Sequence, residues 1–290
     1  MKSLVGRLSC IALSLLMLSG CGGGSGDVRD KQDMRSQARV RSQHKNAIDI
    51  YYSLPSPLEI AHVIQNSGVG YEPSLLHKVE LGVRYSTNMS SALNLGIYGA
   101  DLSYSIYFDQ NQVALKYLDC IKNLASELDV SDSLTISKLK QMEDNIQNKE
   151  MLKKLVSQTF FHSDALLKEN SRRPAAVMIA MGMWIESLYI STSLSESDPA
   201  HNPSLTTTIV EQGLVFDDLM GMLNALDETP DVSRLKSELE PLKTSYGAIH
   251  SSLGGSFVVS PGSAVSYDKK LFGDICNDVR LLRTNITEMF

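Results

Sequence analysis

Apolar residues recur every three or four positions through most of the chain after residue 56, and this spacing constrains the fold more than any other feature. One such stripe runs from Val232 to Leu253 and another from Phe272 to Ile286. This period is typical of amphipathic helices that bury one face. Alternating, strand-like patterns are nearly absent. The sequence therefore predicts an all-α fold, a bundle or array of roughly eight long, mostly antiparallel helices.

Capping signals set the expected helix boundaries. The residues Ser-Pro-Leu-Glu at 56–59 form a capping box with proline at the first helical position, and Pro203 and Pro230 begin later helices. Because the apolar spacing continues through Pro241, we expect one kinked helix there rather than two. The expected helices cover residues 57–66, a short segment after 73, 88–129 (one helix, or two that break near residue 109), 132–145, 149–170, 174–194, 203–226, 230–253 and 266–287.

A TPR-like helical-repeat solenoid is the alternative architecture, although no regular repeat period or tetratricopeptide signature is present. A strand-like run at 257–259 could form a small hairpin with 264–265, and a loop suits it equally well. The run 174–194 is apolar on nearly all sides, as in a membrane span or a helix at the centre of a bundle. Glu186 interrupts this run, which favours a central core helix.

The first 21 residues carry the most specific motif. Lys2 and Arg7 precede an uncharged, apolar or small run at 8–19, which has about the length of a signal-peptide core and is too short to span a bilayer. The run ends in Leu-Ser-Gly-Cys at 18–21. This quartet resembles the lipobox of bacterial lipoproteins, in which the cysteine thiol carries a diacylglycerol. The resemblance implies that Cys21 is lipidated and attaches the mature chain to a membrane of the cell envelope.

Three regions follow from this interpretation: a signal peptide at 1–20, the lipidated cysteine with a flexible tether at 21–46, and a single all-helical domain at 47–290. The tether combines glycines with charged and amide side chains. Such a segment buries too little apolar surface to offset its ordering entropy. Gly22, rather than Asp, follows the cysteine, which in enterobacterial-type envelopes implies an outer-membrane location, on either the periplasmic or the surface face.

Charge excludes nucleic acid from the expected partners. Without Lys2 and Arg7, the mature chain has 25 Lys and Arg against 33 Asp and Glu, a formal charge of −8. A basic stripe or polybasic tail is absent from the sequence. The expected partners are therefore a membrane, through the N-terminal lipid, and an envelope protein, glycan or small ligand.

Two cysteines remain once Cys10 leaves with the signal peptide and Cys21 is acylated. Cys120 and Cys276 both lie in helical patterns near apolar stripes. The envelope permits disulfides, so the two residues could form a disulfide or remain as buried free thiols.

Two small-residue helices, 92–104 and 175–189, share a pattern: each carries one acid three residues before a tyrosine. Their glycines would allow close packing. A carboxylate in an apolar helix needs partners or a raised pKa, and such acids mark functional pockets more often than surface acids do. A hydrogen bond to Tyr, Ser or Arg on a neighbouring helix is the favoured alternative. The candidate pocket consists of Asp101, Glu186, Tyr98, Tyr104, Trp184 and Tyr189.

Motifs for catalysis are missing from the sequence, which has no His-Glu-x-x-His, Cys-x-x-Cys, P-loop or Gly-x-Ser-x-Gly. Glu59 and His62 form a single Glu-x-x-His step, where a di-iron bundle needs two. No metal or cofactor is therefore predicted, and no catalytic residue is assigned. We favour a non-catalytic binding or scaffolding lipoprotein. The alternative is an envelope hydrolase or ligand-binding protein that uses carboxylates in a helical-bundle cleft.

Two runs in the mature part, Tyr-Tyr-Ser-Leu-Pro-Ser-Pro at 51–57 and Asn-Leu-Gly-Ile-Tyr-Gly-Ala-Asp at 94–101, resemble uncharacterised all-helical envelope lipoproteins of Gram-negative bacteria. That group has no assigned activity. The resemblance therefore supports the expected location and fold and implies no reaction or substrate.

Overall fold

The structure is a computed structural model that describes Leu54 and residues 56–128, 133–162, 172–197, 203–255 and 267–289. Every regular element in these residues is a helix, which confirms the predicted all-α class. All of these helices belong to one compact unit. The expected signal peptide, Cys21, the tether and the 257–265 hairpin lie outside the described residues.

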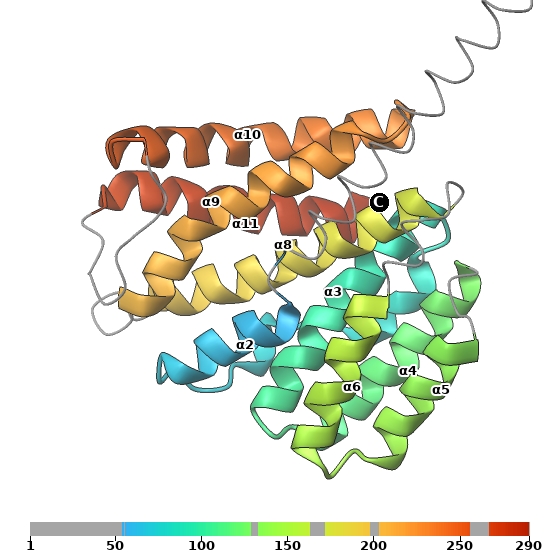
Figure 1. The fold of residues 1–290 in the computed structure, drawn as a ribbon. Coiled ribbons are helices and arrows are strands. Elements are labelled where there is room, and N and C mark those ends of the chain that lie inside the picture. Colours follow the sequence, from blue (N-terminus) through green and yellow to red (C-terminus); the bar gives the residue numbers. More distant parts are fainter. Residues whose placement is uncertain are drawn as a thin grey trace, which may run out of the picture. The chain divides into compact units, whose positions relative to one another are not determined.

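The helices follow the predicted order along the chain (Figure 1). They are α2 (Pro57–Asn66), the 3-10 helices η1 (Pro73–Leu75) and η2 (Val79–Arg84), α3 (Asn88–Tyr107), α4 (Asn111–Glu127), α5 (Ser133–Asp144), α6 (Lys149–His162), α8 (Arg173–Ser197), α9 (Pro203–Asn224), α10 (Pro230–Ser252) and α11 (Lys269–Met289). The 88–129 segment divides at Asp109, whose φ of 58° ends the helical path. α10 continues through Pro241 as one helix, as predicted.

The capping residues explain where several helices begin. The Ser56 hydroxyl accepts from the Glu59 amide at 3.2 Å, and the Glu59 carboxylate accepts from the Ser56 amide at 2.7 Å, so the predicted capping box is formed. Thr87 and Thr229 cap α3 and α10 through their hydroxyls. Each cap satisfies amide groups that have no partner inside the helix.

α3 and α8 form the most extensive helix contact in the described part of the chain. Two glycines make this contact possible. A Cβ atom on Gly96 would lie 2.1 Å from the Ile179 carbonyl oxygen, and one on Gly182 would lie 1.9 Å from the Leu93 carbonyl oxygen. The backbones therefore touch where any larger residue would separate them. The two helices with matching sequence patterns do pack together.

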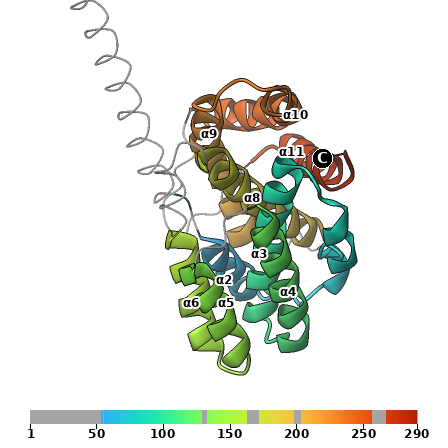
Figure 2. The same ribbon diagram turned by 90° about the vertical axis from the view of Figure 1, so that its right-hand side faces the viewer.

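Six of the remaining helices lie on two sides of the α3–α8 pair. Figure 2 shows α9, α10 and α11 on one side and α4, α5 and α6 on the other. Each side has its own apolar cluster, and α3 contributes to both. α8 is long and apolar enough to cross a membrane by length and composition, but 83% of its most apolar window is buried. Its place at the centre of the bundle accounts for that composition.

Candidate functional site

Asp101 and Glu186 meet where α3 packs on α8. The two carboxyl groups lie within hydrogen-bonding reach of each other. Both side chains are 0% exposed. Two carboxyl groups in an apolar interior need compensating partners, because an unpaired buried charge is strongly unfavourable.

Arg283 on α11 is the principal partner of this pair. Its Nε donates to Glu186 Oε2 at 3.0 Å, and one terminal nitrogen donates to Oε1 at 3.1 Å. This bidentate geometry is the strongest arrangement between a guanidinium and a carboxylate. The guanidinium carbon also lies 4.8 Å from the centre of the Tyr189 ring, a cation–π contact. Arg283 therefore joins α11 to α8 through one side chain.

The segment before α3 supplies the partner of Asp101. The backbone amide of His77 donates to Asp101 Oδ2 at 3.1 Å. The carbonyl of the same residue accepts from the Tyr117 hydroxyl at 2.9 Å. The His77 imidazole Nε2 lies 2.6 Å from the Tyr85 hydroxyl, which itself donates to the Thr287 carbonyl at 3.2 Å. His77 and Tyr85 thus connect α3, α4 and the last turn of α11.

Burial governs the protonation of this cluster, which we call the closed junction: His77, Tyr85, Asp101, Glu186 and Arg283. Desolvation, reinforced by the nearby Glu186, raises the pKa of Asp101 well above its usual value. Desolvation also raises the pKa of Glu186, while Arg283 opposes that rise. Burial and Arg283 lower the pKa of His77 to about 3, so the imidazole is neutral at pH 7.

Two of the four aromatic residues of the candidate pocket contact the closed junction. Tyr189 does so through the guanidinium of Arg283. Tyr98 does so through the His77 imidazole, with the two ring centres 5.2 Å apart, while its hydroxyl donates to the Lys78 carbonyl at 3.0 Å. Both residues therefore border the pair of acids through an intermediate side chain.

The other two aromatic residues of the candidate pocket form hydrogen bonds with groups outside the closed junction. The Tyr104 hydroxyl accepts from the Glu72 amide at 3.0 Å. The Trp184 indole donates to Gln212 at 2.9 Å. Both side chains belong to the apolar cluster that α8 shares with α9, α10 and α11. The predicted set of six residues is thus brought together only in part.

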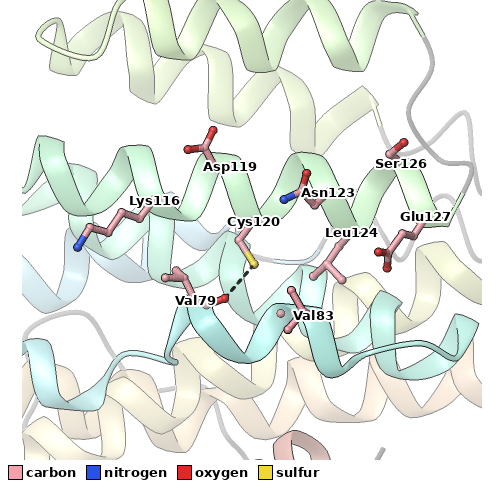
Figure 3. A pocket seen from close by; sticks show the side chains of 10 residues that line it. Val79, Val83, Lys116, Asp119, Cys120, Asn123, Leu124, Ser126 and Glu127 are labelled. Carbon is pink, nitrogen blue, oxygen red and sulfur yellow. Dashed lines mark hydrogen bonds between the residues drawn. The ribbon is translucent and has the colours of Figure 1, made fainter.

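A concave surface that the sequence patterns did not indicate lies between η2 and α4, and we call it the groove (Figure 3). Its volume is about 580 Å³. Val83 on its η2 side is 89% exposed. Gly82 lets η2 approach α4 closely, because a Cβ there would lie 2.6 Å from Cys120 Sγ. The α4 side of the groove presents Lys116, Asp119, Asn123, Ser126 and Glu127.

Cys120 and Cys276 are buried free thiols, and the alternative disulfide is not formed. Cys120 lies at the groove, with Sγ 3.9 Å from the Val79 carbonyl oxygen. Burial raises the pKa of Cys120 to about 11 and that of Cys276 to about 12. A thiol that stays protonated at pH 7 is a poor nucleophile, so Cys120 contributes packing rather than reactivity.

The described residues contain no cluster of three or more His, Cys, Asp or Glu side chains that could hold a metal ion. No family model, curated protein or solved structure matches this chain. The roles of the closed junction and the groove are therefore inferred from their own geometry and from the sequence.

Proposed function

We propose that this chain is a lipid-anchored protein of the bacterial cell envelope that acts as a non-catalytic binding or scaffolding module. The anchor is supported by the sequence at its start: two basic residues, a short apolar run and Leu-Ser-Gly-Cys at 18–21. Cys21 would carry the lipid, and Gly22 after it favours the outer membrane. The acidic mature chain makes nucleic acid a poor partner.

The burial and pairing of the two acids support a non-catalytic role. A general acid or base must reach its substrate directly or through one water molecule. Asp101 and Glu186 are 0% exposed, and both oxygens of Glu186 accept from Arg283. This arrangement favours a structural role over the alternative carboxylate hydrolase, because neither acid faces solvent.

The groove supports the binding part. It is open and places valine methyl groups beside amide, hydroxyl and charged side chains. Apolar walls with a few polar groups that fix orientation are typical of ligand sites. An envelope protein segment, a glycan or a small polar ligand would find complementary groups there.

Lipidation is tested by metabolic labelling with an alkyne analogue of palmitate. The parent should be labelled and should sediment with membranes. Cys21→Ala should lose the label and appear as unprocessed or soluble protein, because the acceptor thiol is gone. Cys120→Ala is the matched control and should be labelled like the parent. Normal labelling of Cys21→Ala would contradict the anchor.

Binding at the groove is tested in living cells with a photo-crosslinking amino acid at position 123, on the α4 side of the groove. The matched control carries the same amino acid at position 237, an exposed position on α10. Discrete adducts are expected at 123 and not at 237. The same adducts from both positions, or none from 123, would contradict the assignment of the groove as the binding surface.

A further inference from the structure

The closed junction contains two carboxyl groups and one guanidinium. Asp101 and Glu186 are both fully buried, and Arg283 directs its Nε and one terminal nitrogen to Glu186. If both acids were ionised, the core would hold two negative charges against one positive charge. An excess charge of this kind inside a protein is usually removed by taking up a proton.

The oxygen atoms of Asp101 show where that proton belongs. Oδ2 accepts from the His77 amide. Oδ1 is buried. As long as the carboxyl group is ionised and can only accept, Oδ1 has no hydrogen-bond partner among the described residues. Asp101 and Glu186 interact as side-chain hydrogen-bond partners, and an ionised Glu186 carboxylate has no hydrogen to give. A hydrogen on Oδ1 converts this contact between two acceptors into a hydrogen bond and leaves no polar atom of Asp101 unsatisfied.

We propose that Asp101 and Glu186 hold a single proton at neutral pH, carried on Asp101 and donated to Glu186, and that this proton makes the packing of α11 and the His77 segment on α3 and α8 sensitive to pH. The protonated pair leaves one negative charge, which Arg283 neutralises. Loss of the proton to solvent base leaves a second negative charge with no cation of its own.

The other groups around the pair do not change this charge balance. Besides Arg283, they are Tyr71, His77 and Tyr85 before the start of α3, Tyr98 on α3, Tyr117 and Cys120 on α4, and Tyr189 on α8. His77 is neutral at pH 7 because its pKa falls to about 3. Burial raises the pKa values of Tyr98 and Tyr117, so these phenols are neutral too.

The direction of the pH effect follows from linkage. Burial and the neighbouring Glu186 raise the pKa of folded Asp101, whereas an unfolded aspartate has a pKa of about 4. Above that pH the folded chain binds one more proton than the unfolded chain. The contribution of Asp101 to stability is therefore fully present below about pH 4 and is lost as the pH rises through the folded pKa. Over this range the folding equilibrium constant falls by up to about tenfold for each pH unit.

The proton can be observed directly in the full-length protein in detergent, by NMR with aspartate labelled at the side-chain carboxyl carbon. One aspartate signal should have the chemical shift of a protonated acid at pH 7. Asp101→Asn should remove that signal, and Asp217→Asn, at an exposed position on α9, should leave it. Parent protein in which every aspartate is ionised at pH 7 would overturn the proposal, and this result needs no variant.

The effect on packing is tested by the slope of stability against pH between about pH 7 and 8.5. The His, Cys and Tyr side chains are common to the parent and the variants, so a difference in slope reports the carboxyl group that was replaced. For each pH unit, the folding equilibrium constant of the parent should fall by up to about tenfold more than that of Asp101→Asn. Asp217→Asn should have the same slope as the parent. Equal slopes for the parent and Asp101→Asn would overturn the pH sensitivity.

Discussion

The closed junction and the groove both gather polar side chains, but they do so under opposite conditions. At the junction, Asp101 and Glu186 are sealed from solvent, and their bonds to Arg283 and His77 connect elements far apart in the chain. At the groove, Asp119, Asn123 and Glu127 stand at an open surface. The groove residues are open to solvent, whereas the two acids of the junction have protein groups in place of water. The junction is therefore suited to hold the fold, and the groove is suited to meet a ligand.

The largest expected effect is at Arg283. Arg283→Met leaves the Glu186 carboxylate buried without its cation, which should lower the free energy of unfolding by about 3–5 kcal/mol. Arg280→Met is the matched control on the same helix. Arg280 pairs with Glu196 at the surface, where both side chains are more than a third exposed, so its loss should be about 0–1 kcal/mol. Urea unfolding measures both, and equal losses would remove the distinction between the junction and the surface.

The next largest effect concerns the contact that closes the junction. Gly182→Ala places a Cβ 1.9 Å from the Leu93 carbonyl oxygen, so α3 and α8 must move apart, at a cost of about 3 kcal/mol. Gly247→Ala in α10 has nothing within 4 Å of the new Cβ and should stabilise by about 0.5–1 kcal/mol through helix propensity. Thermal melts that shift both variants in the same direction would contradict the close contact.

The smallest effect on stability is expected at the groove. Asn123→Ala removes a groove side chain that the solvent can replace, so the free energy of unfolding should change by less than about 0.5 kcal/mol. The variant should nevertheless weaken the contact that a crosslinker at position 119, also in the groove, detects. A loss of stability comparable to that of Arg283→Met would make the groove part of the structural core instead.

Much of the fold can be predicted from the sequence because its determinants are local. The capping box at 56–59, the prolines that open α9 and α10, and the apolar period through Pro241 depend only on neighbouring residues. The sequence does not decide between one helix and two at Asp109, because a positive φ at a non-glycine residue has no clear sequence signal. The α3–α8 contact is indicated by glycines in two matching helices.

The candidate site can be predicted only in part. Asp101 and Glu186 are recognisable as acids in apolar helices, but Arg283 is 97 residues away from Glu186 in the chain. The apolar stripe 272–286 contains two arginines, Arg280 and Arg283, and the sequence alone does not pair either of them with Glu186. The groove cannot be predicted, because one of its walls is η2, a 3-10 helix without an extended apolar period. Both features depend on tertiary contacts that single-helix patterns do not encode.

A double-mutant cycle between Glu186 and Arg283 tests most directly the claim that the closed junction acts as one structural unit. Glu186→Gln, Arg283→Met and the double variant are compared with the parent by urea unfolding. Arg283→Met leaves the buried Glu186 carboxylate without its cation, and Glu186→Gln removes that charge. The double variant should therefore lose about 2 kcal/mol less unfolding free energy than the sum of the two single losses. Losses that add to within about 0.5 kcal/mol would show that the two side chains are independent, and would contradict the account.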